Sequence, residues 1–62
     1  MYPNYELKPY YYGLGLYRAD KDGFFHVVHY FKYEELEGDV SLTNEVVRSK
    51  ICDIEKCIDL YN

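Results

Sequence analysis

The sequence predicts a small α+β fold in one domain, residues 1–62, and three observations predict it. An Asp-Gly turn signal between two β-prone runs predicts a small antiparallel β-sheet built on a hairpin over 14–31. Good helix formers before Gly38 predict one short helix near 32–38, and a patterned segment at 44–58 predicts a C-terminal strand or helix. A chain of 62 residues buries only about 60% of its unfolded surface, so we expect a homodimer to supply further stability.

Residues 1–12 are predicted to form an extended, Tyr-rich arm. This stretch holds both prolines and five of the nine tyrosines, and its apolar residues follow no sustained period. Because proline fixes φ and removes a backbone donor, we expect an extended arm that packs through its rings.

The hairpin is predicted by Asp22-Gly23, because a type I′ turn needs positive φ at both central residues and Asp-Gly tolerates it. Both faces of this hairpin are substantially apolar, whereas a half-solvated hairpin alternates apolar and polar residues. We therefore expect one face to pack on the rest of the chain and the other on a second subunit or a target. The expected cross-strand pairs are Leu14 with Phe31, Leu16 with His29, and Arg18 with Val27.

Gly13 and Gly15 lie in the first strand of the predicted hairpin. They lack the third glycine and the following helix of a dinucleotide-binding fingerprint. We interpret them as strand glycines that let an aromatic ring or another backbone approach closely. The turn at 20–23 also fails as a calcium loop, because Arg18 and His29 would occupy its first and last ligand positions.

The segment 44–58 admits two interpretations. One is an amphipathic helix, for which Thr43 or Asn44 is a suitable N-cap. The other is a strand, favoured by β-branched residues within 45–52, although strict alternation fails at Cys52. The pattern alone favours the helix, whose stripe is formed by Val47, Ile51, Ile54 and Ile58.

The composition limits the classes of partner. Eleven acidic residues against seven basic ones argue against a nucleic-acid ligand, which needs a basic footprint. No apolar run approaches the length of a membrane span, and the first residues lack the charged and apolar regions of a signal peptide. We expect cytoplasmic residence and, in that compartment, reduced thiols at Cys52 and Cys57.

The candidate metal ligands and nucleophiles are His26, His29, Cys52 and Cys57. Two histidines three positions apart on a strand are expected on opposite faces, and two cysteines five apart do not share a helix face. We expect partly buried histidines and small core cysteines, with no metal, no cofactor and no catalytic residues.

The predicted functional segment is an acidic cluster that follows the hairpin. Its carboxylates fit a solvated helix face, a catalytic pair, or an acidic surface that meets a basic groove. A solvated face is the commonest of these, but aromatic anchors ringed by carboxylates are typical of a protein-binding patch, which favours the third. The predicted partner-binding residues are Tyr30, Phe31, Tyr33, Glu34, Glu35, Leu36, Glu37 and Asp39.

Four motifs follow one another in the chain: the Asp-rich turn at 20–23, the aromatic strand at 26–30, the segment 33–39, and the run 44–48. With the small size and acidic balance, they resemble the small uracil-DNA glycosylase inhibitors of Bacillus phages.

The resemblance implies a homodimer, a three-stranded antiparallel sheet with one helix per subunit, and a groove between subunits that captures a protruding apolar side chain. It also implies that Tyr33 and Glu34 match the family's aromatic-Glu pair, that Glu37 replaces its second aromatic residue, and that residues 45–56 form the third strand.

One functional hypothesis and two rivals follow. We expect a non-enzymatic phage inhibitor in the host cytoplasm that binds the DNA-binding face of a host DNA-processing enzyme, most specifically uracil-DNA glycosylase. It would act by acidic and aromatic mimicry of DNA. The first rival is an assembly module whose aromatic faces serve only its own oligomer. The second is a small enzyme or metal protein, which requires His26 or His29 at ligand distance from a cysteine or a carboxylate.

Overall fold

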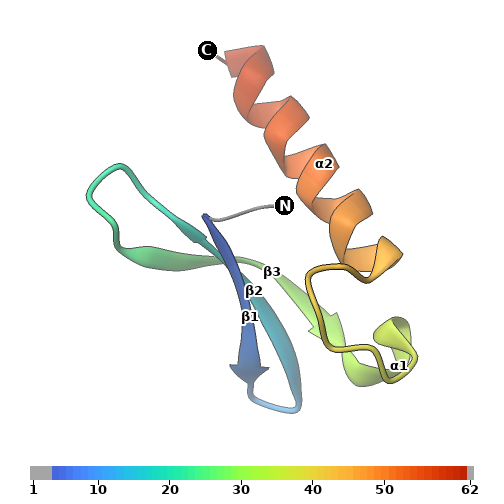
Figure 1. Cartoon of the computed structure of the whole chain (residues 1–62). Helices are drawn as coiled ribbons and strands as arrows, with labels where there is room; N and C mark the ends of the chain where they lie inside the picture. Colours follow the sequence, from blue (N-terminus) through green and yellow to red (C-terminus); the bar gives the residue numbers. More distant parts are fainter. Residues whose placement is uncertain (1–3, 62) are drawn as a thin grey trace.

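The computed structural model describes residues 4–61, with side chains described up to residue 57. The fold is α+β, as predicted, and has two layers: a three-stranded antiparallel sheet of order β1-β2-β3, and a C-terminal helix that packs on one face of it (Figure 1). The elements in chain order are β1 (Tyr5–Tyr10), β2 (Gly13–Ala19), β3 (Phe25–Lys32), α1 (Tyr33–Leu36) and α2 (Glu45–Tyr61).

Strand β1 is made from residues 5–10 of the segment expected as an extended arm. It pairs along its whole length with β2 and forms one edge of the sheet, where a residue such as Pro9 is tolerated. Tyr5 is buried and Leu7 packs against the core, while Glu6 and Lys8 alternate with them and lie on the other face. The third strand of the sheet is therefore N-terminal, and the expectation of a third strand at 45–56 is wrong.

The hairpin of β2 and β3 is confirmed, but its register changes midway. Leu14 pairs with Phe31 and Leu16 pairs with His29, as predicted. A β-bulge between Leu16 and Tyr17 then shifts the pairing, so Arg18 faces His26 rather than Val27.

The cause of the shift lies in the turn. The backbone N–H of Asp20 donates to the carbonyl of Phe24 at 2.8 Å, and the N–H of Gly23 donates to the carbonyl of Asp20 at 3.1 Å. Gly23, with φ of 88°, is the only residue of this loop with positive φ, so the turn has three loop residues instead of the predicted type I′ pair. The bulge compensates for the extra loop residue, and the far end of the hairpin recovers the predicted register.

The interpretation of Gly13 and Gly15 as sites of close approach is confirmed. A side chain at Gly13 would collide with the Phe31 carbonyl and the Tyr30 ring, and one at Gly15 would meet the Tyr10 and Tyr17 side chains closer than ordinary van der Waals contact. Both glycines thus let tyrosine side chains approach the backbone of β2 closely.

The short helix near 32–38 is confirmed as α1. It ends at Leu36, because Glu37 adopts a left-handed conformation (φ 50°) and donates its backbone N–H to the carbonyl of Glu34. Gly38 follows with φ of 85°, so two successive left-handed residues turn the chain away from the helix.

The helical interpretation of 44–58 is confirmed by α2, and the strand alternative is wrong. Of the two candidate caps, Asn44 is the N-cap, because its Oδ1 accepts the backbone N–H of Val46 at 2.9 Å. Val47 and Ile51 are fully buried and Ile54 packs against the core, whereas the side chain of Ile58 lies outside the described residues.

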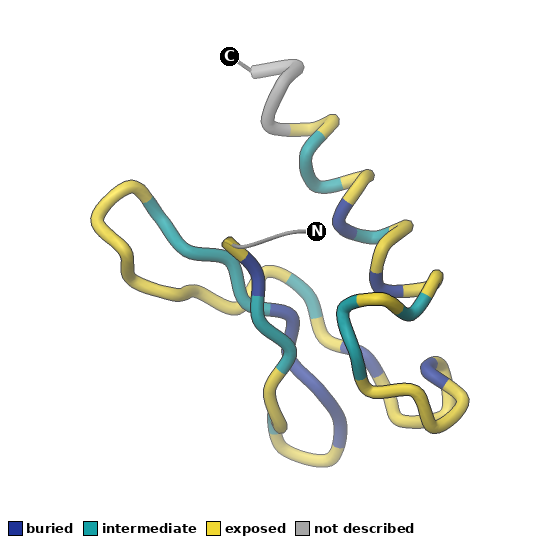
Figure 2. Tube along the Cα trace, viewed as in Figure 1, coloured by how far each residue is buried: buried dark blue, intermediate teal, exposed yellow. Residues whose placement is uncertain are grey.

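The core lies between the sheet and α2 (Figure 2). At its edge Tyr5 joins three elements, because its hydroxyl donates to Glu55 of α2 at 3.0 Å and accepts from Nε of Arg18 in β2 at 3.2 Å. The core consists of Tyr5, Leu14, Leu16, Phe31, Leu36, Val47 and Ile51.

Candidate functional site

Two of the eight predicted partner-binding residues are structural. Phe31 and Leu36 are each 1% exposed, so neither offers appreciable surface to a partner. The error has a simple cause: cross-strand pairing with Leu14 turns Phe31 toward α2, and Leu36 anchors α1 to the core. Tyr30, the neighbour of Phe31, lies on the opposite face of the sheet and is partly exposed.

The remaining predicted residues are exposed on α1 and the loop that follows it. Tyr33 is 48% exposed, and its three glutamate neighbours are exposed as well. Because Leu36 is packed in the core, the short helix holds these side chains at a fixed place on the surface. The exposed set is Tyr33, Glu34, Glu35, Glu37 and Asp39.

A surface depression lies between the α1 segment and the first turn of α2, and we call it the acidic notch. Its polar rim contains four carboxylates, and Leu36 and Val46 contribute its apolar lining. Glu45 is the member that sequence reasoning missed, because it is distant along the chain and its one signal was its place in the first turn of a helix. The notch is lined by Glu35, Leu36, Glu37, Asp39, Asn44, Glu45 and Val46.

Asn44 holds the two walls of the acidic notch together. Its Nδ2 donates to the carbonyls of Leu36 at 2.9 Å and Asp39 at 2.8 Å, while its Oδ1 caps α2. One side chain therefore fixes the end of α1 relative to the start of α2.

The carboxylates of the notch carry uncompensated negative charge. Within the part of the chain whose side chains are described, none of them forms an ion pair with Lys or Arg, and Asp39 accepts a hydrogen bond from Ser41 Oγ at 2.8 Å. Among the same residues no group of three or more His, Cys, Asp or Glu is arranged to hold a metal ion. The arrangement is suited to attracting a cationic surface.

A wider groove continues from the acidic notch along α2 toward β3. Burial lowers the pKa of His29 in its wall below the ordinary 6.5, Lys50 lowers it further and Glu35 opposes the change. The lowered pKa favours the neutral imidazole, so His29 adds little positive charge to the acidic surface. The groove is lined by His29, Phe31, Glu35, Glu45, Val46, Ser49, Lys50 and Asp53.

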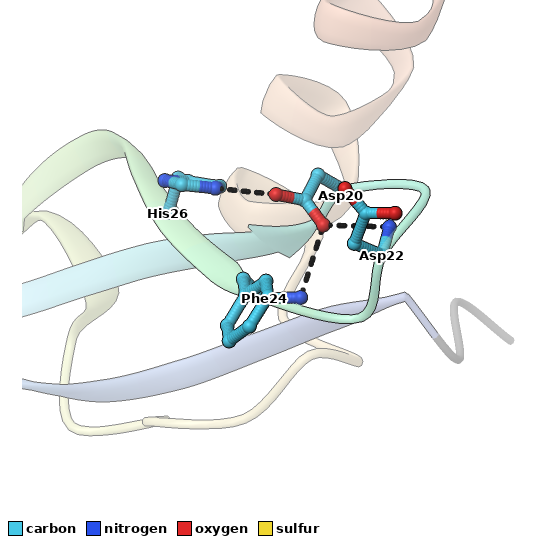
Figure 3. Close-up of polar contacts among 4 residues, drawn as sticks. All are labelled: Asp20, Asp22, Phe24 and His26. Atoms are coloured by element: carbon cyan, nitrogen blue, oxygen red, sulfur yellow. Dashed lines mark hydrogen bonds and ion pairs between the residues drawn. The ribbon is translucent and has the colours of Figure 1, made fainter.

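The other histidine and the two cysteines do not join this surface. His29 pairs with Leu16, as predicted, and the bulge places His26 opposite Arg18, so both histidines lie on the face toward α2 instead of on opposite faces as expected. His26 Nε2 lies 2.7 Å from Asp20 Oδ2 in the hairpin turn (Figure 3). The rival hypothesis of an enzyme or metal protein requires a histidine this close to a carboxylate, but here the two side chains form an exposed hydrogen-bonded pair in the turn. Cys52 and Cys57 are free, and both are exposed rather than in the core.

A second surface lies on the face of the sheet away from α2, which no described element covers. Lys8 lies over the rings of Tyr17 and Phe25, at 5.2 and 5.5 Å from their centroids, and forms an ion pair with Glu6 at 3.0 Å. This surface is therefore aromatic and nearly neutral. We call it the open sheet face; it comprises Glu6, Lys8, Tyr10, Tyr17, Phe25, Val27 and Tyr30.

Comparison of the chain with protein-family models, with curated proteins and with solved structures found no match. Among residues 4–61, no helix is long and apolar enough to cross a membrane.

Proposed function

We propose that the protein is a non-enzymatic inhibitor that binds the DNA-binding face of a DNA-processing enzyme in the cytoplasm of a phage-infected host. The observation that carries this proposal is the acidic notch, in which carboxylates from two separate segments converge and none forms an ion pair with Lys or Arg among the described side chains. A surface that binds DNA phosphates is basic, and complementary potential both speeds encounter with such a surface and selects it.

The mechanism is competitive exclusion. Carboxylates at the rim of the notch stand where DNA phosphates meet Lys and Arg of the enzyme. Asn44 fixes the two walls before binding, so little conformational entropy is lost on association.

The apolar part of the contact belongs to residues other than Phe31 and Leu36. Val46 lines the notch and is partly exposed, and Tyr33 is exposed on the short helix that carries Glu35, outside the notch lining. An exposed ring and an exposed aliphatic residue on the same side as the carboxylates suit a protruding aliphatic side chain of the target. Tyr33 is also the residue that matches the aromatic position of the inhibitor family that the sequence resembles.

Uracil-DNA glycosylase is the most specific target, and the resemblance of the segment 33–39 supports it. The position of the third strand is the main departure from that resemblance, because β1 takes the place expected for residues 45–56.

The test is inhibition of a purified bacterial uracil-DNA glycosylase acting on uracil-containing DNA. The double variant Glu37→Gln, Glu45→Gln removes two of the four charges of the notch, and we expect inhibition to weaken about tenfold and to depend less on salt. Asp22→Asn is the matched control, because it removes a charge at the exposed hairpin turn outside the notch. If the glycosylase stays active in a large excess of the wild-type protein, it is not the target. If Asp22→Asn weakens inhibition as much as the double variant does, the notch is not the binding site.

The open sheet face favours a second candidate function, an assembly module in which aromatic residues mediate only self-association. The same face supports a homodimer for the inhibitor, since a marginal chain gains stability by covering it. Val27→Glu places a charge on this face, and we expect sedimentation analysis to show a dimer for the wild type and a monomer for the variant. A wild-type protein that is monomeric at all concentrations contradicts both the assembly module and the homodimeric inhibitor.

A further inference from the structure

The hairpin that joins β1 to β2 exposes two aromatic side chains at its tip. Tyr10 pairs with Gly13, so the loop consists of Tyr11 and Tyr12 alone. Tyr11 is 84% exposed and Tyr12 is 91% exposed, the two highest values among the large apolar side chains described. Neither contributes to the core.

The backbone at Tyr11 is strained. Its φ is 54°, in the left-handed region that disfavours side chains with a Cβ, and it stands at the first central position of a two-residue hairpin loop, where glycine or asparagine is preferred. Strain of this kind persists where the surroundings maintain it, and it concentrates at functional sites. An aromatic residue at this position destabilises the turn, so a role other than folding is needed to explain it.

Ring contacts support the tip at Tyr11. The Tyr11 ring meets the Tyr10 ring edge-to-face at 4.7 Å between centroids, and Tyr10 meets Tyr30 at 5.7 Å. Tyr30 in turn lies over Gly13, whose missing side chain leaves room for it. Rigid, exposed aromatic side chains lose little entropy on binding and are typical anchors of protein interfaces.

The tip lies at the same end of the molecule as the acidic segment. Gly13, directly after the tip, pairs with Lys32, directly before Tyr33 of α1 (Figure 1). The aromatic tip and the carboxylates that follow Lys32 therefore belong to one end of the sheet, while the turn at 20–24 lies at the other.

We propose that the Tyr11-Tyr12 tip is an anchor of the same interface as the acidic notch, and that it inserts into an apolar pocket beside the basic surface of the target enzyme. This inference rests on the proposed function and adds residues to its site. The tip binds a protein and not a lipid surface, because the carboxylates at this end of the molecule repel anionic headgroups and attract a basic protein surface.

The test compares two substitutions at the tip with one at the far turn, using titration of purified bacterial uracil-DNA glycosylase and thermal unfolding of each variant. Tyr11→Asn suits the left-handed backbone, and Tyr12→Ser removes a ring that carries no strain. Phe24→Ser is the matched control, since Phe24 is an exposed aromatic residue at the opposite end.

We expect Tyr11→Asn to keep or raise the melting temperature while weakening binding about tenfold, and Tyr12→Ser to weaken binding to a similar extent. Phe24→Ser should bind as the wild type does. A purely structural role predicts instead that stability falls with affinity at Tyr11. If Tyr11→Asn lowers the melting temperature, the affinity of Tyr12→Ser for the glycosylase decides whether the tip contacts the target, because Tyr12 carries no backbone strain.

Two negative results are distinguishable. A glycosylase that does not bind the wild type overturns the proposed target and this inference with it. A glycosylase that binds the wild type, Tyr11→Asn and Tyr12→Ser equally well overturns the inference about the tip and leaves the acidic notch as the site.

Discussion

Replacing Asn44 by alanine removes three hydrogen bonds, one that caps α2 and two that connect its start with the end of α1 and the loop that follows. The lost N-cap bond to Val46 costs about 1 kcal/mol of unfolding free energy. The two bonds from Nδ2 add about 1.5 kcal/mol, with the partly buried one to Leu36 counted in full and the exposed one to Asp39 at about half. The expected total is about 2.5 kcal/mol, a large share of the stability of so short a chain.

Asn44→Ser separates the two contributions, because serine caps a helix about as well as asparagine but has no amide donor. We expect it to lose about 1.5 kcal/mol. Thr43→Ala is the control at the other candidate cap; the Thr43 hydroxyl bonds only to Ser41 Oγ among the described residues, so its loss should cost under about 0.5 kcal/mol.

Urea unfolding followed by circular dichroism measures these differences. With a slope of about 1 kcal/mol per molar urea, the midpoint should fall by about 2.5 M for alanine and about 1.5 M for serine. Equal midpoints for Asn44→Ala and Asn44→Ser would show that the cap contributes nothing, and a shift no larger than that of Thr43→Ala would refute the role of Asn44 as the tie between the two walls.

Three further predictions concern the sheet and its turn. Gly13→Ala should destabilise the fold by about 1–3 kcal/mol in thermal unfolding, because the added methyl group meets the Phe31 carbonyl; a variant as stable as the wild type would contradict that close approach. Tyr5→Phe should cost about 1 kcal/mol by the same measurement, since Glu55 loses its hydroxyl donor, and no change would mean that water replaces it fully. The hydrogen bond from His26, followed by the N–H of Phe24, lowers the pKa of Asp20 below its ordinary 3.8. The stability that the Asp20 carboxylate adds is therefore complete above pH 3.8 and is lost as pH falls through the lowered pKa. NMR titration should show the turn opening only in that acidic range. The variant Asp20→Asn should abolish this pH dependence.

Local signals predicted the elements whose causes are local. The Asp-Gly turn predicted the hairpin, the spacing of Val47, Ile51 and Ile54 predicted α2, and Asn44 was one of two candidates for its cap. Each depends on residues within a few positions of one another, where the geometry of a turn or a helix is decided.

Features that depend on distant pairing were not predictable in this way. Nothing in residues 1–12 alone indicates that β2 has a free edge for β1, and Pro9 argued against a strand. The bulge arises from a one-residue difference in loop length; it changes the partner of Arg18 and moves His26 to the other face of the sheet relative to expectation, while His29 keeps its predicted partner. Glu45 joins the acidic notch because Asn44 brings two chain segments together, which no local pattern records.

The distribution of charge links the two surfaces. The chain carries a net charge of −4, and its second half contains eight of the 11 acidic residues, so two copies repel wherever their acidic notches approach. The open sheet face is nearly neutral, since Glu6 and Lys8 compensate each other there, and it lies on the side of the sheet away from α2. Self-association through the open sheet face would therefore leave both acidic notches turned outward and available. Such a dimer would hold one target at each notch, whereas the groove between subunits implied by the resemblance would hold a single target. The ratio of target to dimer thus distinguishes an inhibitor whose site is complete within one chain from one whose site is built by two.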